Sequence, residues 1–159
     1  MSKLHYIVPT APAKTPFTAR LGATGSANNY STLDEGKPVK LAAESQYNLT
    51  AAGDEIEGFI LGVDTATAGG FSIGSVVEDG QFNVTFDGIQ ATPGTGTVAI
   101  GDYVVTGTIV ARGTALTVFP RVCKATNAGN TLNYKWRVVS LGTAGSGAVS
   151  TSGVIKRVL

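Results

Sequence analysis

The chain has 159 residues, of which 14% are charged, compared with about 25% in an average soluble domain. One cysteine, Cys123, excludes an intrachain disulfide, and no apolar run approaches the roughly 20 residues that span a bilayer. The net charge of +1 conceals a polarity, because all eleven acidic residues lie between Asp34 and Asp102 while seven of the twelve basic residues follow Asp102. This pattern indicates a partly covered surface and favours oriented contact with charged surfaces, including other copies of the chain.

Residues 1–33 predict an extended N-terminal arm. Pro9, Pro12 and Pro16 recur among small and polar residues, and no alternating pattern buries one face of the segment. The segment is either a disordered tail or an arm that becomes ordered against a neighbouring molecule, and we favour the arm. Its apolar anchors are expected to be Tyr6, Ile7, Val8 and Phe17.

Residues 34–159 predict a single all-β domain, a small β-barrel or a jelly-roll-like sandwich. Twenty threonines and seventeen valines favour strands, and 27 Gly and Pro residues separate short apolar runs. Sustained helical periodicity is absent from every window of ten or more residues. In chain order, the expected strands cover 58–63, 71–77, 82–86, 97–100, 103–111, 116–125, 132–138 and 148–158.

Two alternating runs indicate which side chains face the core. Residues 82–86 place their aromatic and valine side chains on one face. In the same way, Tyr134 and Trp136 lie on the face opposite Lys135 and Arg137. Because a core would bury these two aromatic rings, stacking of a single-stranded nucleic acid on them is not expected. We therefore expect no direct contact with nucleic acid.

Two local signals predict how strands end. Glu78-Asp-Gly80 predicts a tight hairpin turn, because Asp-Gly accommodates the positive φ that such a turn requires. Pro120 has no backbone N–H, so the strand over 116–125 is expected to be an edge strand or to carry a bulge.

The residues that carry catalytic or metal chemistry are sparse. His5 is the only histidine and Cys123 the only cysteine, so the chain lacks a positioned triad base and a zinc ligand set. Cys123 is expected to fill the core. Asp54, Glu55 and Glu57 suggest calcium binding or glycoside hydrolysis, although a solvated loop is the preferred interpretation. We predict no enzyme activity, no cofactor and no metal.

Several phrases resemble the head decoration, or cement, proteins of tailed bacteriophages. They are GKPVKL (36–41), AGDEIEGFILGV (52–63), GDYVVTGTIVARGTAL (101–116), WRVVSL (136–141) and VIKRV (154–158). The resemblance covers about 34–159 and rests on turn-and-strand phrases that have no chemistry of their own. Proteins of this family bind the outside of a mature icosahedral shell as dimers or trimers, often with an extended arm.

The resemblance implies a structural virion protein. It would bind the outer surface of an icosahedral phage capsid and stabilise the expanded shell by clamping neighbouring major capsid subunits. The expected partners are the major capsid protein and further copies of this chain, with a trimer favoured over a dimer, and no membrane. The expected location is the outer capsid surface, after synthesis in the host cytoplasm, since the N-terminus lacks the apolar stretch of a secretory signal.

Contacts with these partners are assigned to the arm anchors and to basic residues. The basic candidates are Arg20, Arg112, Lys135, Arg137, Lys156 and Arg157. Two other functions stay open. A carbohydrate-binding or adhesive module would use exposed aromatic rings, for which Tyr30, Tyr47 and Tyr103 are the candidates. A small hydrolase would need two carboxylates from 54–102 about 5–10 Å apart in a cleft.

Overall fold

The computed structural model describes residues 6–7, 16–22, 30–64, 72–126 and 134–158, and these form an all-β fold. The predicted fold class is therefore confirmed. None of these residues belongs to a helix long and apolar enough to cross a membrane. The elements are β1 (Tyr6–Ile7), β2 (Phe17–Leu21), the 3₁₀ helix η2 (Thr32–Asp34), β3 (Pro38–Ala43), β4 (Gln46–Leu49), β5 (Gly58–Asp64), β6 (Ser72–Val77), β7 (Gln81–Ile89), β8 (Thr92–Pro93), β9 (Val104–Thr106), β10 (Arg121–Lys124), β11 (Trp136–Ser140) and β12 (Ser152–Arg157).

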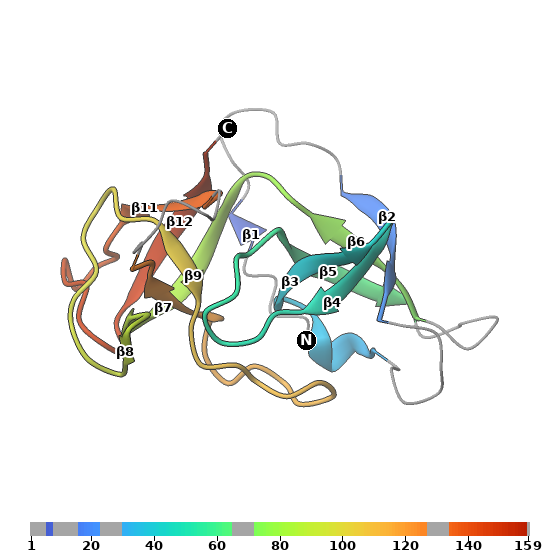
Figure 1. Ribbon diagram of the computed structural model, residues 1–159, viewed down its shortest axis with the longest axis horizontal. Helices are drawn as coiled ribbons and strands as arrows, with labels where there is room; N and C mark the ends of the chain where they lie inside the picture. The colour runs from blue at the N-terminus through green and yellow to red at the C-terminus, as the bar shows by residue number, and fades with distance from the viewer. Residues whose placement is uncertain (1–5, 8–15, 23–29, 65–71, 127–133, 159) are drawn as a thin grey trace.

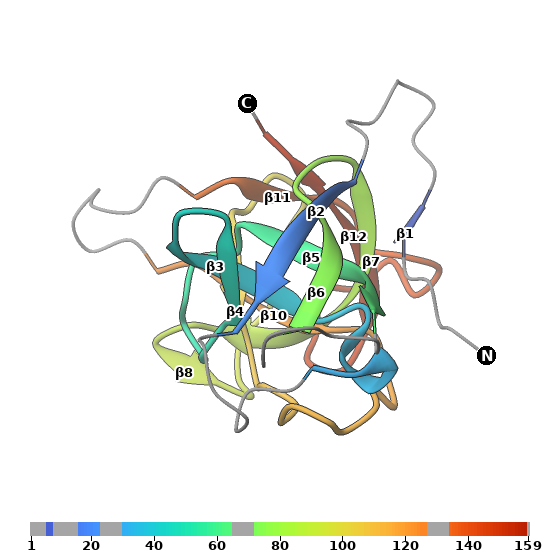
Figure 2. The same ribbon diagram turned by 90° about the vertical axis from the view of Figure 1, so that its right-hand side faces the viewer.

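The N-terminal half of the chain forms a closed barrel in the order β2-β4-β3-β5-β6, with β6 pairing back to β2 (Figures 1 and 2). Strands β2 and β4 are parallel, and the other neighbours are antiparallel. Alternate side chains point inward, as the two-residue period of a strand requires. The interior is filled by Ala19, Leu21, Tyr30, Val39, Tyr47, Ile60 and Val76.

The C-terminal half forms a second sheet in the order β11-β12-β7-β10-β9, with β1 and β8 also pairing with β7. A bridge between Tyr103 and Arg137 connects the two ends of this order, so the second sheet curls on itself. The predicted inward alternation of 82–86 and of Trp136 is confirmed, since these apolar side chains are buried. The rings of Phe59 and Phe82 stack at 4.1 Å, and Trp136 packs edge-on against both.

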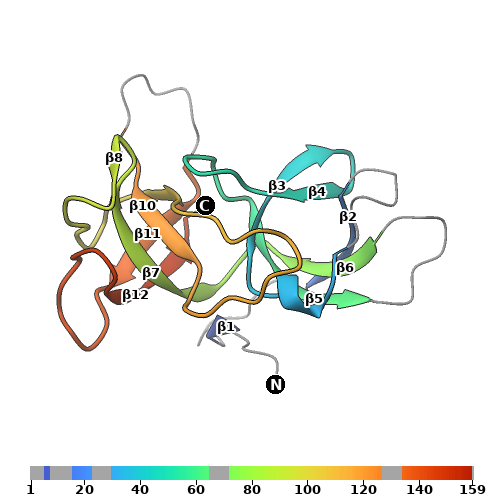
Figure 3. The same ribbon diagram turned by 90° about the horizontal axis from the view of Figure 1, so that it is seen from below.

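Residues 51–57 connect the two halves. Trp136 Nε1 donates a hydrogen bond to the carbonyl of Ile56 at 3.0 Å, and Ile56 is fully buried in the core of the second sheet. Thr106 of β9 donates its N–H to the carbonyl of Asp54, and its own carbonyl accepts from Gly53. The barrel and the second sheet lie side by side (Figure 3). They therefore share part of one core.

The predicted arm over 1–33 does not include residues 17–21. These residues form β2, which pairs with β6 along its whole length and closes the barrel. Burying Ala19 and Leu21 in the barrel outweighs the extended, solvated state that the neighbouring prolines favour. Of the residues before them, β1 pairs Tyr6 with Phe82 of β7, whereas Val8 lies outside the described residues.

The turn predicted at 78–80 exists, but it does not make a hairpin. Gly80 has the positive φ of 99° that the Asp-Gly pair indicates. The strands on either side belong to different sheets, because β6 pairs with β5 and β2 while β7 pairs with β12 and β10. The turn therefore directs the chain from the barrel into the second sheet.

The region around Pro120 differs from the prediction in part. Strand β10 begins only at Arg121 and lies between β7 and β9, so it is not an edge strand. Its pairing with β7 does shift register, as at a bulge, but between Val122 and Lys124 and not at Pro120. Pro120 precedes the strand, where a missing N–H costs no ladder hydrogen bond, and its carbonyl accepts from Thr85. The strand predicted over 103–111 is reduced to β9, and 97–100 is a turn region.

Two barrel glycines offer a matched test of this packing. A Cβ on Gly74 would lie 2.5 Å from Leu21 Cδ1 and 2.6 Å from the carbonyl oxygen of Gly62, whereas a Cβ on Gly62 meets only Glu35 Oε1 at 4.0 Å. We expect Gly74→Ala to lower the free energy of unfolding by about 1–3 kcal/mol through overpacking. Gly62→Ala should change it by less than about 0.5 kcal/mol. Urea unfolding of both variants checks this, and equal effects would contradict the barrel interior described above.

Candidate functional site

A row of side chains crosses the outer face of the second sheet. Arg137 of β11 is the register partner of Lys156 of β12, and Lys156 is the partner of Gln81 of β7. On the other side, Tyr103 bridges Arg137. Directly opposed residues of antiparallel strands point to the same face, so these four side chains lie next to one another. We call Tyr103, Arg137, Lys156 and Gln81 the basic row.

The basic row carries positive charge that the fold does not neutralise. Arg137 and Lys156 are exposed, and neither side chain has an ion-pair or hydrogen-bond partner among the residues that the structure describes. Like charges directly opposite one another on a sheet are destabilising. Tyr103 adds an exposed ring, whose centroid lies 6.3 Å from that of Tyr134. An acidic partner would neutralise the two charges and cover the aromatic ring.

Tyr134 does not follow the predicted alternation. It is half-buried and contacts Tyr103, whereas Trp136 is completely buried. The reason is that β11 begins at Trp136, so Tyr134 precedes the strand and its side chain does not follow the strand's alternation.

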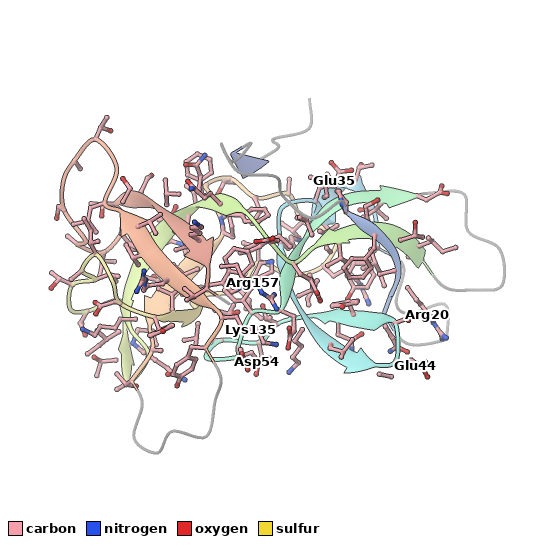
Figure 4. The ribbon with its side chains drawn as sticks, turned by 90° about the horizontal axis from the view of Figure 1, so that it is seen from above. Arg20, Glu35, Glu44, Asp54, Lys135 and Arg157 are labelled. Carbon is pink, nitrogen blue, oxygen red and sulfur yellow. The ribbon has the colours of Figure 1, made fainter. Side chains whose placement is uncertain are left out.

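Two other predicted contact residues, Lys135 and Arg157, lie at the junction of the barrel and the second sheet (Figure 4). Lys135 Nζ forms an ion pair with Glu57 and approaches Glu55 at 4.0 Å, and Arg157 Nη1 donates to the carbonyl of Glu57 at 2.6 Å. These cations therefore connect the two halves of the molecule. Burial raises the pKa of the Glu55 carboxyl, the nearby Lys135 ammonium opposes this, and the negative charge of Glu57 adds to it.

The acidic cluster of Asp54, Glu55 and Glu57 is not a solvated loop. Asp54 pairs with Lys40 at 2.5 Å, and the two glutamates face Lys135. Within the described ranges, no three His, Cys, Asp or Glu side chains are arranged to hold a metal ion. Two clefts border residues 117–119, and neither has a carboxylate in its lining, so neither has the paired acids that the hydrolase alternative needs.

The candidate tyrosines for a carbohydrate site are mostly internal. Tyr30 and Tyr47 are buried in the barrel, and only Tyr103 is exposed. The hydroxyl of Tyr47 donates to Glu78, and that of Tyr30 accepts from the N–H of Leu49. Burial, followed by the contact with Glu78, raises the pKa of Tyr47. The aromatic platform that the carbohydrate-binding alternative requires is therefore not formed by these three residues.

The remaining predicted contacts are spread over the surface. Phe17 is partly exposed, with its ring 5.7 Å from that of Tyr47. Arg20 lies at the end of the barrel with Glu44 (Figure 4). The Arg112 guanidinium lies 5.8 Å above the ring of Tyr30. None of the three therefore belongs to the basic row.

A loop between β9 and β10, which no sequence pattern predicted, is held in place at two points. Residues 107–120, here called the anchored loop, extend from the second sheet to η2 of the barrel (Figures 1 and 3). At the loop tip, Lys37 Nζ donates to the carbonyl of Ala111, and the N–H of Gly113 donates to Asp34 Oδ1, both at 2.7 Å. Lys37 and Asp34 also pair at 2.7 Å, with side chains only 2% and 0% exposed.

A second buried carboxylate fixes the base of the anchored loop. Asp87 Oδ2 accepts from the N–H of Thr108 at 2.7 Å and from its hydroxyl at 2.5 Å. Its other oxygen pairs with Arg121 at 3.2 Å. Cys123 is buried nearby, as expected, and burial together with Asp87 raises the pKa of its thiol to about 11. The loop has no strand of its own, yet its backbone is fixed at both ends.

Asp34 and Asp54 allow the anchor to be tested with matched substitutions, because each carboxylate pairs with a lysine and only Asp34 is fully buried. We expect Asp34→Ala to lower the free energy of unfolding by about 3–5 kcal/mol, because it leaves the buried Lys37 without its counter-charge. Asp54→Ala should cost at most about 1 kcal/mol. Denaturant unfolding measures both, and hydrogen exchange at Gly113 should accelerate in Asp34→Ala alone. Similar costs for the two variants would refute the role of the anchor.

Comparison of the chain with models of protein families gives no match. Comparisons with curated proteins and with solved structures give no match either. The resemblance to phage head decoration proteins therefore rests on the sequence phrases alone. Any function must be argued from the surfaces that the fold presents, of which the basic row and the anchored loop are the most distinctive.

Proposed function

We propose that this protein is a structural component of an icosahedral phage particle. It binds the outer surface of the assembled shell and clamps neighbouring major capsid subunits, and its other partners are further copies of itself, as a trimer. The observation that carries the proposal is the basic row, in which Arg137 and Lys156 are exposed side by side and neither forms an ion pair with a described residue. The resemblance to decoration proteins supports the same function.

The basic row is suited to binding a rigid surface because its own support is rigid. The inward side chains of β11 and β12, Trp136, Val138 and Ile155, are fully buried, so the outward residues project from a well-packed sheet. A preorganised surface loses little conformational entropy when it binds. Complementary charge orients the approach and raises the association rate.

Clamping follows from thermodynamic linkage. A protein that binds the assembled shell more tightly than free subunits stabilises the assembled state by mass action. Many copies on one shell multiply a modest contact energy. The clamp must itself resist separation, and the contacts of Lys135, Arg157 and Trp136 with residues 56–57 connect its two halves.

We expect the wild-type protein to co-sediment with expanded shells made of the major capsid protein from the same source. The double variant Arg137→Gln, Lys156→Gln should bind about tenfold more weakly, corresponding to about 1.4 kcal/mol for two charge contacts. The matched control is Lys40→Gln, Lys124→Gln, which removes the same charge from lysines already paired with Asp54 and Asp102. It should bind like the wild type, and 0.5 M salt should weaken the wild type because screening at that strength is strong.

Two results would count against the proposal. The shell function is wrong if the wild type does not bind expanded shells and mass spectrometry of purified particles detects at most a few copies of the protein per particle. If the wild type binds but both double variants bind equally well, the basic row is not the contact.

A further inference from the structure

The anchored loop is irregular, yet two buried carboxylates hold its backbone in place, which is the property of a preorganised binding surface. Asp34 holds the tip through Gly113, and Asp87 holds the base through Thr108. Buried ion pairs contribute little net stability compared with apolar residues of the same size. Binding surfaces, in contrast, gain from side chains whose positions are set by a supporting layer of hydrogen bonds.

The fixed loop presents apolar side chains to solvent. Ile109 and Val118 are 51% and 45% exposed, and Val110, Leu116 and Phe119 are partly exposed beside them. The hydrogen bonds of Asp34 and Asp87 hold the loop without burying these side chains. Fixing the loop therefore does not add them to the hydrophobic core. Arg112 is the only charged residue between Thr108 and Pro120.

Beneath the loop lies a cleft of about 90 Å³. The loop side chains form one wall, and Pro38, Leu49 and Thr50 of the barrel side form the other. Thr106 also lines the cleft, is 1% exposed, and its hydroxyl oxygen has no hydrogen-bond partner among the described residues. The lining also includes Lys37, Arg121 and three further threonines, Thr50, Thr108 and Thr117, so the cleft is largely but not wholly apolar. A buried hydroxyl without a partner is costly, so a group that hydrogen-bonds Thr106 would be favoured there.

A wider cleft of about 400 Å³ shares the lining residues Thr117, Val118 and Phe119 with the first. Its lining combines the loop residues Val118 and Phe119 with Thr85, Arg121 and Ser152 of the second sheet. The segment 117–119 thus lines both clefts, and both combine apolar side chains with hydroxyl groups. This arrangement has space for an inserted side chain and for the backbone that carries it.

We propose that the narrow cleft is a socket for one apolar side chain on a surface loop of the shell subunit. The inserted side chain packs against Ile109 and Val118, and a polar group beside it hydrogen-bonds the Thr106 hydroxyl. The partner loop is acidic next to the inserted residue, because the positive charge of Arg112, which belongs to the same loop and lies over the Tyr30 ring, is close to the cleft and no acidic residue lines either cleft. This inference rests on the proposed shell function and adds the contact that supplies apolar burial.

The first test removes the exposed apolar surface. The double variant Ile109→Ser, Val118→Ser should lower the affinity for expanded shells at least tenfold, because anchors buried at the centre of an interface dominate its energy. Its melting temperature should stay close to that of the wild type, since both side chains are already exposed. The matched control is Leu41→Ser, Ile100→Ser, which changes side chains that are 52% and 65% exposed elsewhere, and its affinity should not change.

The second test uses Thr106→Val, which keeps the shape of the side chain and removes its hydroxyl. We expect the free protein to melt at a higher temperature, because a buried hydroxyl without a partner is removed, and to bind shells several-fold more weakly. Unchanged stability together with unchanged affinity would mean that water alone satisfies Thr106, which would overturn the socket.

The outcomes separate this inference from the proposed function. Loss of binding in the Ile109, Val118 variant with normal binding of its control supports the socket. If the wild type binds shells and the loop variant binds equally well, the socket is wrong while the shell function stands. If the wild type itself fails to bind, the shell function and the socket are both wrong.

Discussion

The buried pair of Asp34 and Lys37 is the constraint on which the rest of the arrangement depends. One carboxylate oxygen binds both the Lys37 ammonium and the Gly113 N–H, while the other accepts from the N–H of Ser31. The pair thus connects η2, the first residues of the barrel and a loop of the second sheet. Removing two charges from water is costly, and attraction with full hydrogen bonding offsets that cost only when the geometry is good. The pair therefore holds the anchored loop, which lines both clefts, in a fixed position.

The charge polarity of the sequence coincides with the two halves of the fold. Residues 16–77 carry three basic and seven acidic side chains, a net charge of −4, and residues 78–158 carry seven basic and four acidic ones, a net charge of +3. Part of this polarity acts inside the molecule, since Lys135 of the basic half pairs with Glu57 of the acidic half. Arg137 and Lys156 point outward instead, so this part of the polarity faces a partner and not the acidic half of the molecule.

Local sequence patterns predicted the strands that alternation of apolar and polar residues alone can reveal. The alternation in 82–86 and at Trp136 gave both the strands and the buried side chains. Strand β2 was missed because its five residues become strand-like only through distant pairing with β6, and the prolines before it indicate an extended arm. The Asp-Gly turn revealed that the chain turns at residue 80, but no local signal states which sheet receives the next strand. The anchor was missed for the same reason, since Asp34 and Gly113 are 79 residues apart.

The basic row and the anchored loop contribute different interactions to a contact, namely charge attraction and apolar burial. Charges attract over roughly a Debye length, about 8 Å at physiological ionic strength, so the basic row acts before the surfaces touch and sets their orientation. Apolar burial acts only at contact, where it slows dissociation. Arg137 and Lys156 lie on a sheet, and Ile109 and Val118 lie on a loop fixed to both halves of the molecule. Because neither surface has to reorganise, a steered encounter can proceed directly to a packed contact, which is what the proposed binding to many equivalent sites on one shell requires.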